Sequence, residues 1–170
     1  IAHGTTQATN ALLEGDVAKV GVLAMGSGLE SRRVQADSDV GNIPLAQGKE
    51  LSTVHAYLEL EDAAAARSEI DAALQRLQQS GAAVIVATES FGVDDPANEC
   101  FVMEEARKQG MYATGGHEVS QLYGLRVRTR TAVISPISPI AQPSCIPRTS
   151  RRLITRFIIS PVMCMFCIFC

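Results

Sequence analysis

The first ten residues hold the densest group of side chains that are able to bind a ligand. The chain opens with IAHGTTQATNALLEG, and a helix that starts at Thr6 places Thr6, Thr9 and Asn10 on one face. These small hydroxyl and amide groups adjoin the free backbone N–H groups of a helix N-terminus, which favour phosphate or a developing oxyanion. The alternative is a threonine-capped helix with a solvated polar face, because such caps are common. The spacing alone leaves both interpretations open.

The histidines and the segment VDDPANE offer weaker chemistry. The three histidines are His3, His55 and His117, and no two of them have the close spacing of zinc ligands. In VDDPANE, Asp95 is suited to cap a helix and Pro96 to its first turn, so we interpret this segment as a helix start and not as an acid/base pair.

The last residues carry a cysteine pattern. Cys164, Cys167 and Cys170 have the C-x2-C-x2-C spacing of some iron–sulfur ligands, but no fourth ligand follows and the residues between them are bulky and apolar. The same apolar stretch is nearly long enough to span a membrane, but Arg156 and Pro161 interrupt it. We expect neither a cluster nor a membrane helix here, and keep membrane association as a weaker alternative.

The charge divides the 170-residue chain into two parts. All 18 acidic residues fall within the first 118 positions together with 8 of the 15 Lys and Arg, whereas the rest of the chain holds seven arginines and no acidic residue. An acidic main body argues against nucleic acid as a partner, and the alternating Arg126, Arg128 and Arg130 would form only a small basic edge. The single cysteine of that body, Cys100, fits a reducing, cytoplasmic location.

These residues must be positioned by an alternation of short apolar strands and helices. The continuous apolar runs are typical of buried parallel strands, and glycines end the helices. A repeating strand–helix order of this kind predicts an α/β fold. The expected strands are residues 18–24, 51–60, 82–87 and 111–114; the expected helices are 6–14, 61–80 and 95–110; residues 26–48 are expected to form a loop with one short helix.

Four stretches carry a resemblance to a known family. In order along the chain they read HGTTQATNALLEG, DSDVGNIPLAQGKEL, AVIVATESFGVDDPANE and ATGGHEVSQLYGLRVRTRTAVI. They resemble the N-terminal region of the A-type subunit of the hydantoinase/oxoprolinase family over about residues 1–134. The resemblance implies a partial first lobe of the ATPase fold that sugar kinases, actin and heat-shock proteins share.

The resemblance also implies a function. Members of this family use ATP, with Mg²⁺ expected, to activate the amide of hydantoin, N-methylhydantoin or 5-oxoproline, which is then hydrolysed. Phosphorylation makes the amide carbon electrophilic, and such chemistry depends on positioning and charge stabilisation. Some relatives serve instead in ATP-dependent ketone carboxylases, which remains the alternative. The intact enzyme is expected to work with a B-type subunit or domain.

The resemblance assigns site residues as well. Gly4, Thr5, Thr6, Thr9 and Asn10 are expected to hold phosphate or the polar edge of the substrate. The residues that the resemblance marks as a possible wall of the same cleft are His117 and Glu118.

Two departures from the family pattern limit these expectations. The sequence lacks a D-x-GGT-x-TD phosphate loop and a second lobe. We therefore expect a fragment that is inactive by itself, with a non-catalytic gene remnant as the rival interpretation. Residues 135–170 lack acidic residues and hold most of the prolines and cysteines, so we expect this tail to be foreign to the family.

Overall fold

The computed structural model describes residues 18–45 and 48–135. Its centre is a parallel four-stranded sheet in the order β4-β1-β5-β6. The strands are β1 (Val20–Gly26), β4 (Thr53–Glu59), β5 (Val84–Glu89) and β6 (Tyr112–Gly115). All seven residues of β1 are buried, as expected for a central strand covered on both faces.

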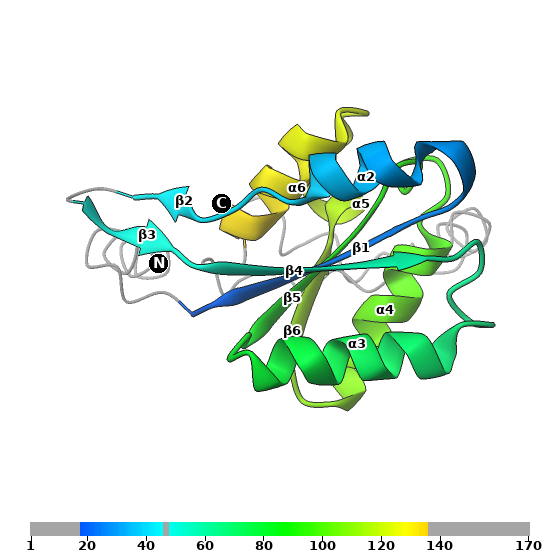
Figure 1. The fold of residues 1–170 in the computed structure, drawn as a ribbon, viewed down its shortest axis with the longest axis horizontal. Helices are drawn as coiled ribbons and strands as arrows, with labels where there is room; N and C mark the ends of the chain where they lie inside the picture. Colours follow the sequence, from blue (N-terminus) through cyan, green and yellow to red (C-terminus); the bar gives the residue numbers. More distant parts are fainter. Residues whose placement is uncertain (1–17, 46–47, 136–170) are drawn as a thin grey trace, which may run out of the picture.

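Helices cover both faces of this sheet (Figure 1). One face carries α3 (Arg67–Gln79) and α4 (Ala97–Lys108), and the other carries α2 (Ser31–Ser38) and α6 (Leu125–Ile134). A 3-10 turn, η1 (Gly28–Glu30), leads into α2, and α5 (Gly116–Val119) follows β6 directly. The predicted α/β fold is confirmed.

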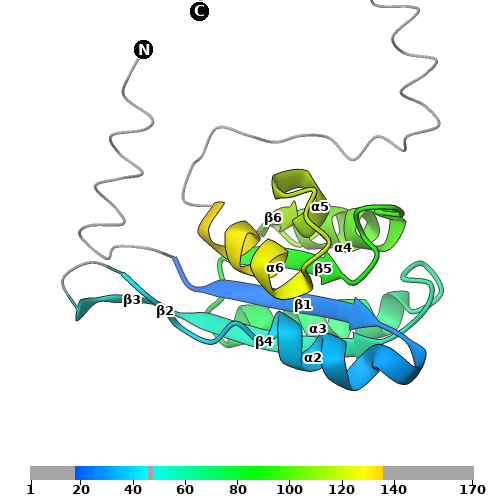
Figure 2. The same cartoon turned by 90° about the horizontal axis from the view of Figure 1, so that it is seen from above.

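Two hydrophobic clusters hold the layers together. The larger cluster packs α3 and α4 on the sheet and includes Leu23, Ile70, Leu74, Ile85 and Met103. The smaller cluster packs α6 on the opposite face and includes Val22, Val86, Ala132 and Val133. Seen from above, β1 passes between α2 and α6 (Figure 2).

The helix expected over residues 61–80 is α3, and its apolar residues form one buried face. Ile70, Ala73, Leu74 and Leu77 are all buried, and Gly81 follows the helix with a left-handed φ of 89°. The helix begins at Arg67, six residues later than expected, because turns occupy the preceding residues. Helix α4 begins at Ala97, two residues later than expected, and its N-cap is Pro96 and not Asp95. Asp95, one position before the cap, accepts a hydrogen bond at Oδ1 from the Ala97 amide, at 3.1 Å.

Three features differ from the expectations. The segment 26–48, expected as a loop with one helix, also contains the short strand β2 (Ile43–Pro44), which pairs antiparallel with β3 (Glu50–Leu51). Helix α6 was not expected at all. The basic edge expected from Arg126, Arg128 and Arg130 is wrong, because these residues lie on α6 and the Arg128 side chain is fully buried.

Candidate functional site at the carboxyl edge of the sheet

The carboxyl ends of the parallel strands define one edge of the sheet. The chain leaves β1 through α2 toward β4, whereas it leaves β5 through α4 toward β6, on the opposite side. The ends of β1 and β5 are therefore a topological switch point, and open α/β sheets bind ligands in the crevice at such a point.

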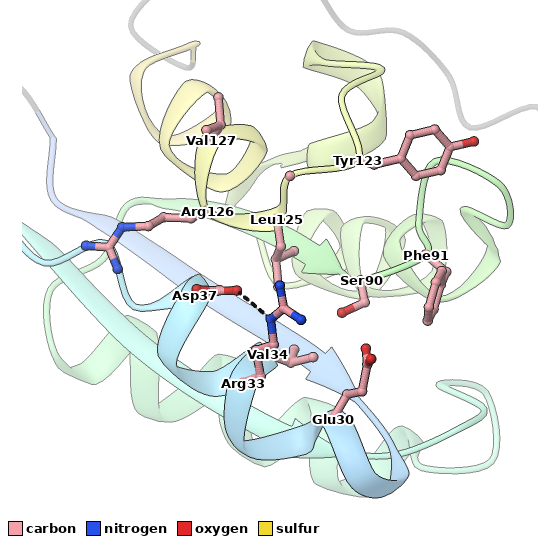
Figure 3. Close-up of a pocket in the computed structure, with 11 residues that line it drawn as sticks. Glu30, Arg33, Val34, Asp37, Ser90, Phe91, Tyr123, Leu125, Arg126 and Val127 are labelled. Atoms are coloured by element: carbon pink, nitrogen blue, oxygen red, sulfur yellow. Dashed lines mark ion pairs between the residues drawn. The ribbon is translucent and has the colours of Figure 1, made fainter.

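A cavity of about 350 Å³ lies at this switch point (Figure 3). It is bounded by α2, by the loop that follows β5 and by the start of α6. Its volume falls in the range of roughly 300–1,000 Å³ that is typical of small-molecule sites. The residues that line it are Glu30, Arg33, Val34, Asp37, Ser90, Phe91, Tyr123, Gly124, Leu125, Arg126 and Val127.

Three polar side chains converge inside this cavity. Figure 3 shows the Glu30 carboxylate, the Arg33 guanidinium and the Ser90 hydroxyl directed toward a common space. Arg33 Nε lies 3.6 Å from Asp37 Oδ2, and the Arg33 side chain is 80% exposed. An ion pair this exposed contributes little stability, so the guanidinium can turn toward a ligand at small cost.

Apolar side chains form the walls. Val34 and Leu125 are buried, and Phe91 is 64% exposed at one side of the opening. Tyr123 and Arg126 lie at the rim and point away from the centre in Figure 3. The Tyr123 hydroxyl donates to Asp94 Oδ1 at 3.0 Å, which ties the rim to the start of α4.

Arg128 fixes the loops that frame the cavity. From its buried position on α6, it donates to the Leu122 carbonyl oxygen at 3.1 Å, to the Ser90 carbonyl oxygen at 3.3 Å and to the Glu89 carbonyl oxygen. Hydrogen bonds from a guanidinium to several carbonyl oxygens are charge-assisted and hold a loop firmly. Arg128 therefore positions Ser90 from behind, without lining the cavity.

A second buried group lies beside β5 and β6. Glu99, on α4, is fully buried and accepts hydrogen bonds from the Glu89 amide at 2.9 Å, the His117 amide at 2.9 Å and His117 Nδ1 at 2.6 Å. The other ring nitrogen, His117 Nε2, lies 3.8 Å from Cys100 Sγ. Both ring nitrogens of His117 thus face α4.

Burial shifts the pKa of two carboxyl groups at this edge, Glu89 and Glu118. Burial raises the pKa of Glu89, opposed mainly by the hydrogen bond from Asn98 Nδ2 at 3.1 Å. Burial also raises the pKa of Glu118, opposed mainly by the hydrogen bond from the Gly115 amide at 3.4 Å. Within the described part of the chain, Glu118 Oε1 is buried without a hydrogen-bond partner.

The predicted site residues are only partly placed by the structure. Gly4, Thr5, Thr6, Thr9 and Asn10 lie outside the described residues. His117 and Glu118 are neighbours on α5, but neither lines the cavity at the switch point. Their roles in binding remain predictions.

The sequence analysis missed the polar residues of the cavity. Glu30 and Arg33 lie within a segment that was expected to be mainly loop, and Ser90 was treated only as part of a family-like stretch. The available signal was their position, because Ser90 directly follows the apolar run of β5, and Glu30 and Arg33 lie in the helical segments that follow the apolar run of β1.

The charge of the cavity lining bears on the binding of ATP. The cavity lining has two acidic and two basic side chains, Glu30, Asp37, Arg33 and Arg126, so its formal charge is balanced. A triphosphate site needs convergent N–H groups or an excess of positive charge. Across residues 18–45 and 48–135, no group of three or more His, Cys, Asp or Glu residues is arranged to hold a metal ion. The lining of this cavity therefore has no excess of positive charge that would attract a triphosphate.

None of the helices within the described ranges is long and apolar enough to cross a membrane.

Comparisons with known proteins relate the chain to one family. The family model of the hydantoinase/oxoprolinase N-terminal region matches residues 1–110. Among solved structures, the chain is similar to an ATP-dependent caprolactamase from Pseudomonas jessenii, with a TM-score of 0.50 and 18% sequence identity over 88% of this chain. It spans only 23% of the length of that protein. No curated protein matches the chain. Because the family model covers well over half of its residues, the chain belongs to the hydantoinase/oxoprolinase family and matches the N-terminal region of that family.

Proposed function

We propose that this chain is part of an ATP-dependent hydrolase of cyclic amides. Membership of the hydantoinase/oxoprolinase family is the observation that carries the proposal. The likeness in fold to a protein named as an ATP-dependent caprolactamase, which is a cyclic-amide hydrolase by name, agrees with it. The net reaction consumes one cyclic amide, one ATP and two waters, and yields the ring-opened acid, ADP and phosphate.

The cavity among the described residues supports the binding of a cyclic amide. A small neutral cavity with an acceptor, a donor and apolar walls suits a ring of modest size. The lining of the cavity has no excess of positive charge, so we assign the contacts with ATP and Mg²⁺ to other residues, beginning with Gly4, Thr5, Thr6, Thr9 and Asn10. We also propose a cytoplasmic location and a B-type subunit or domain as partner.

The test compares the 170-residue chain alone with a chimera in which residues 18–134 replace the equivalent segment of the caprolactamase. Each protein is incubated with ATP, Mg²⁺ and hydantoin, 5-oxoproline or caprolactam, and ADP and ring-opened acid are measured. We expect the chain alone to be inactive and the chimera to form ADP and acid in equal amounts with at least one cyclic amide. ADP formation that responds to acetone with bicarbonate, but to no cyclic amide, would contradict the proposal and favour a ketone carboxylase.

A further inference from the structure

We propose that the switch-point cavity binds the cyclic amide directly, with the Glu30 carboxylate accepting from the amide N–H and the Arg33 guanidinium donating to the amide oxygen. This inference rests on the proposed function and adds to it the binding site and the roles of two residues. It concerns binding only, and it involves no step of the reaction.

The first argument is the pairing of hydrogen-bonding groups. A ring amide presents an N–H donor and a carbonyl acceptor side by side on one edge. An ionised carboxylate only accepts hydrogen bonds and a guanidinium only donates them, so Glu30 and Arg33 are complementary to the two halves of that edge. Both side chains come from η1 and α2 and point into the same space in Figure 3.

The second argument is the balance of charge. The two carboxylates and two guanidiniums of the lining cancel formally, so the cavity offers no net attraction to a polyanion. A neutral ligand with both a donor and an acceptor meets no uncompensated charge in this cavity. The balanced charge therefore favours the neutral amide over the nucleotide, because phosphates require a site that is positive or rich in N–H groups.

The third argument is the apolar surface around the polar groups. Val34 and Leu125 provide buried walls for the carbon side of a ring, while the exposed Phe91 ring stands at the opening. Ser90 adds a hydroxyl that both donates and accepts, and the Arg128 hydrogen bonds to the Glu89 and Ser90 carbonyl oxygens hold its backbone in place. A few fixed polar groups within apolar walls are the usual composition of a small-molecule site.

The experiment is a titration of the 15N-labelled 170-residue chain with hydantoin, followed by amide chemical shifts. We expect the largest shifts at Ser90, Phe91 and the residues of α2. The probe 1,3-dimethylhydantoin lacks both N–H groups, and we expect it to bind about 10-fold more weakly, since a hydrogen bond to a charged group is lost. ATP, titrated without hydantoin, should leave the cavity residues unshifted.

Variants then test the two named residues. Arg33→Gln and Glu30→Ala are each expected to raise the Kd for hydantoin by about 10-fold. Arg32→Gln is the matched control, because Arg32 is exposed on the same helix and does not line the cavity. The amide spectrum of each variant reports whether its fold is intact.

Three results would overturn the inference: no binding of hydantoin to the wild-type chain, equal binding of dimethylhydantoin, or an Arg33→Gln affinity equal to that of Arg32→Gln. Failure of the proposed function has a different signature. In that case hydantoin binds at the cavity as expected, but the chimera forms no ring-opened acid with ATP.

Discussion

Glu99 is buried, and its two carboxylate oxygens accept three hydrogen bonds from β5 and α5. These bonds connect α4 with β5 and α5 at one point. A buried carboxylate is tolerated only when it is fully hydrogen-bonded, and its removal leaves its donors without partners. The residue therefore has a structural role, and no chemistry needs to be assigned to it.

The variant Glu99→Ala tests this role. We expect it to lower the free energy of unfolding by about 3–5 kcal/mol, because three hydrogen-bond donors at one buried point lose their acceptor. Urea denaturation followed by circular dichroism measures the change. The matched control is Glu104→Ala on the exposed side of the same helix, which should stay within about 0.5 kcal/mol of the wild type. Equal losses in the two variants would contradict the assignment.

The raised pKa of Glu118 has a consequence for stability at neutral pH. Because its pKa is higher in the folded chain than in the unfolded chain, the folded state binds the proton more tightly, and stability falls as pH rises through the interval between the two pKa values. Glu118→Gln should therefore be more stable than the wild type at pH 7, and this advantage should shrink as the pH falls toward 4.5 and be absent at pH 4. Thermal unfolding at both pH values measures it, and an advantage that is the same at both would be inconsistent with a shifted carboxyl group.

At the scale of single residues, roles that depend on neighbours in the sequence were predictable, whereas burial and contacts with distant residues were not. The helix start near Asp95 and Pro96 was predictable because capping is local in the chain. The burial of Glu99 was not, since its partner His117 lies 18 positions away and the two meet only when β6 has joined β5. The same applies to the pair of Glu30 and Ser90, which a switch in strand order brings together.

Among the elements, α6 has the widest influence on the candidate site. It packs Ala132 and Val133 on one face of the sheet, and from its first turns Arg128 reaches three backbone carbonyl oxygens in two loops. Helix α6 is also linked to β5 by a hydrogen bond between the Thr129 and Thr88 hydroxyl oxygens, which lie 3.0 Å apart. Packing and loop geometry at the cavity therefore depend on the same helix.

We expect Arg128→Met to destabilise the chain by about 3 kcal/mol, because three carbonyl oxygens lose a charged donor and one replacement side chain cannot satisfy them. Chemical denaturation measures the loss. The substitution Arg130→Met, at an exposed position of the same helix, is the control and should have little effect. If amide shifts of Ser90 and Leu122 are unchanged in Arg128→Met, the side chain does not hold these loops.

The loop after β5 is also constrained by Gly92. A Cβ atom at this position would lie 2.3 Å from Glu99 Oε1, so a side chain here must displace the carboxylate from its hydrogen bonds. We expect Gly92→Ala to cost about 1–3 kcal/mol, as in other overpacked sites. Gly124→Ala is the control, since the nearest atom to its Cβ is 4.0 Å away. A melting temperature of Gly92→Ala equal to that of the control would show that the loop relaxes freely.

The elements themselves were largely predictable where the apolar pattern is strong. Strands β1, β5 and β6 were expected within two residues of their ends, because continuous apolar runs can bury both faces. Helix α6 escaped prediction because three arginines interrupt its apolar residues, and one of them is buried through hydrogen bonds that no periodicity reveals. The hairpin of β2 and β3 was missed because each strand has only two residues.

At the scale of the whole molecule, the four strands depend on contacts that run along the entire described chain. β1 pairs with both β4 and β5, and β5 pairs in turn with β6. The α/β class follows from the order of elements in the sequence, whereas the strand order does not, since several orders satisfy the same pattern. The boundary between the family-like region and the tail, expected after residue 134, remains a prediction.

A chain ending at residue 110 tests how much of the fold is one cooperative unit. It keeps α3 and α4 but loses β6 and α6, so β5 is left with an unpaired edge and the face that Ala132 and Val133 cover is exposed. We expect it to aggregate or to unfold without a cooperative transition, whereas the 170-residue chain unfolds with one. Calorimetry distinguishes the two, and a sharp transition in the shortened chain would contradict this view.

The position of α6 has a further consequence for how such proteins are divided for study. The match to the family model stops at residue 110, but α6, which covers one face of the sheet together with α2, is formed by residues 125–134. The folded unit therefore extends beyond the residues that the family model matches. Fragments cut at residue 110 would lose the helix whose start borders the cavity.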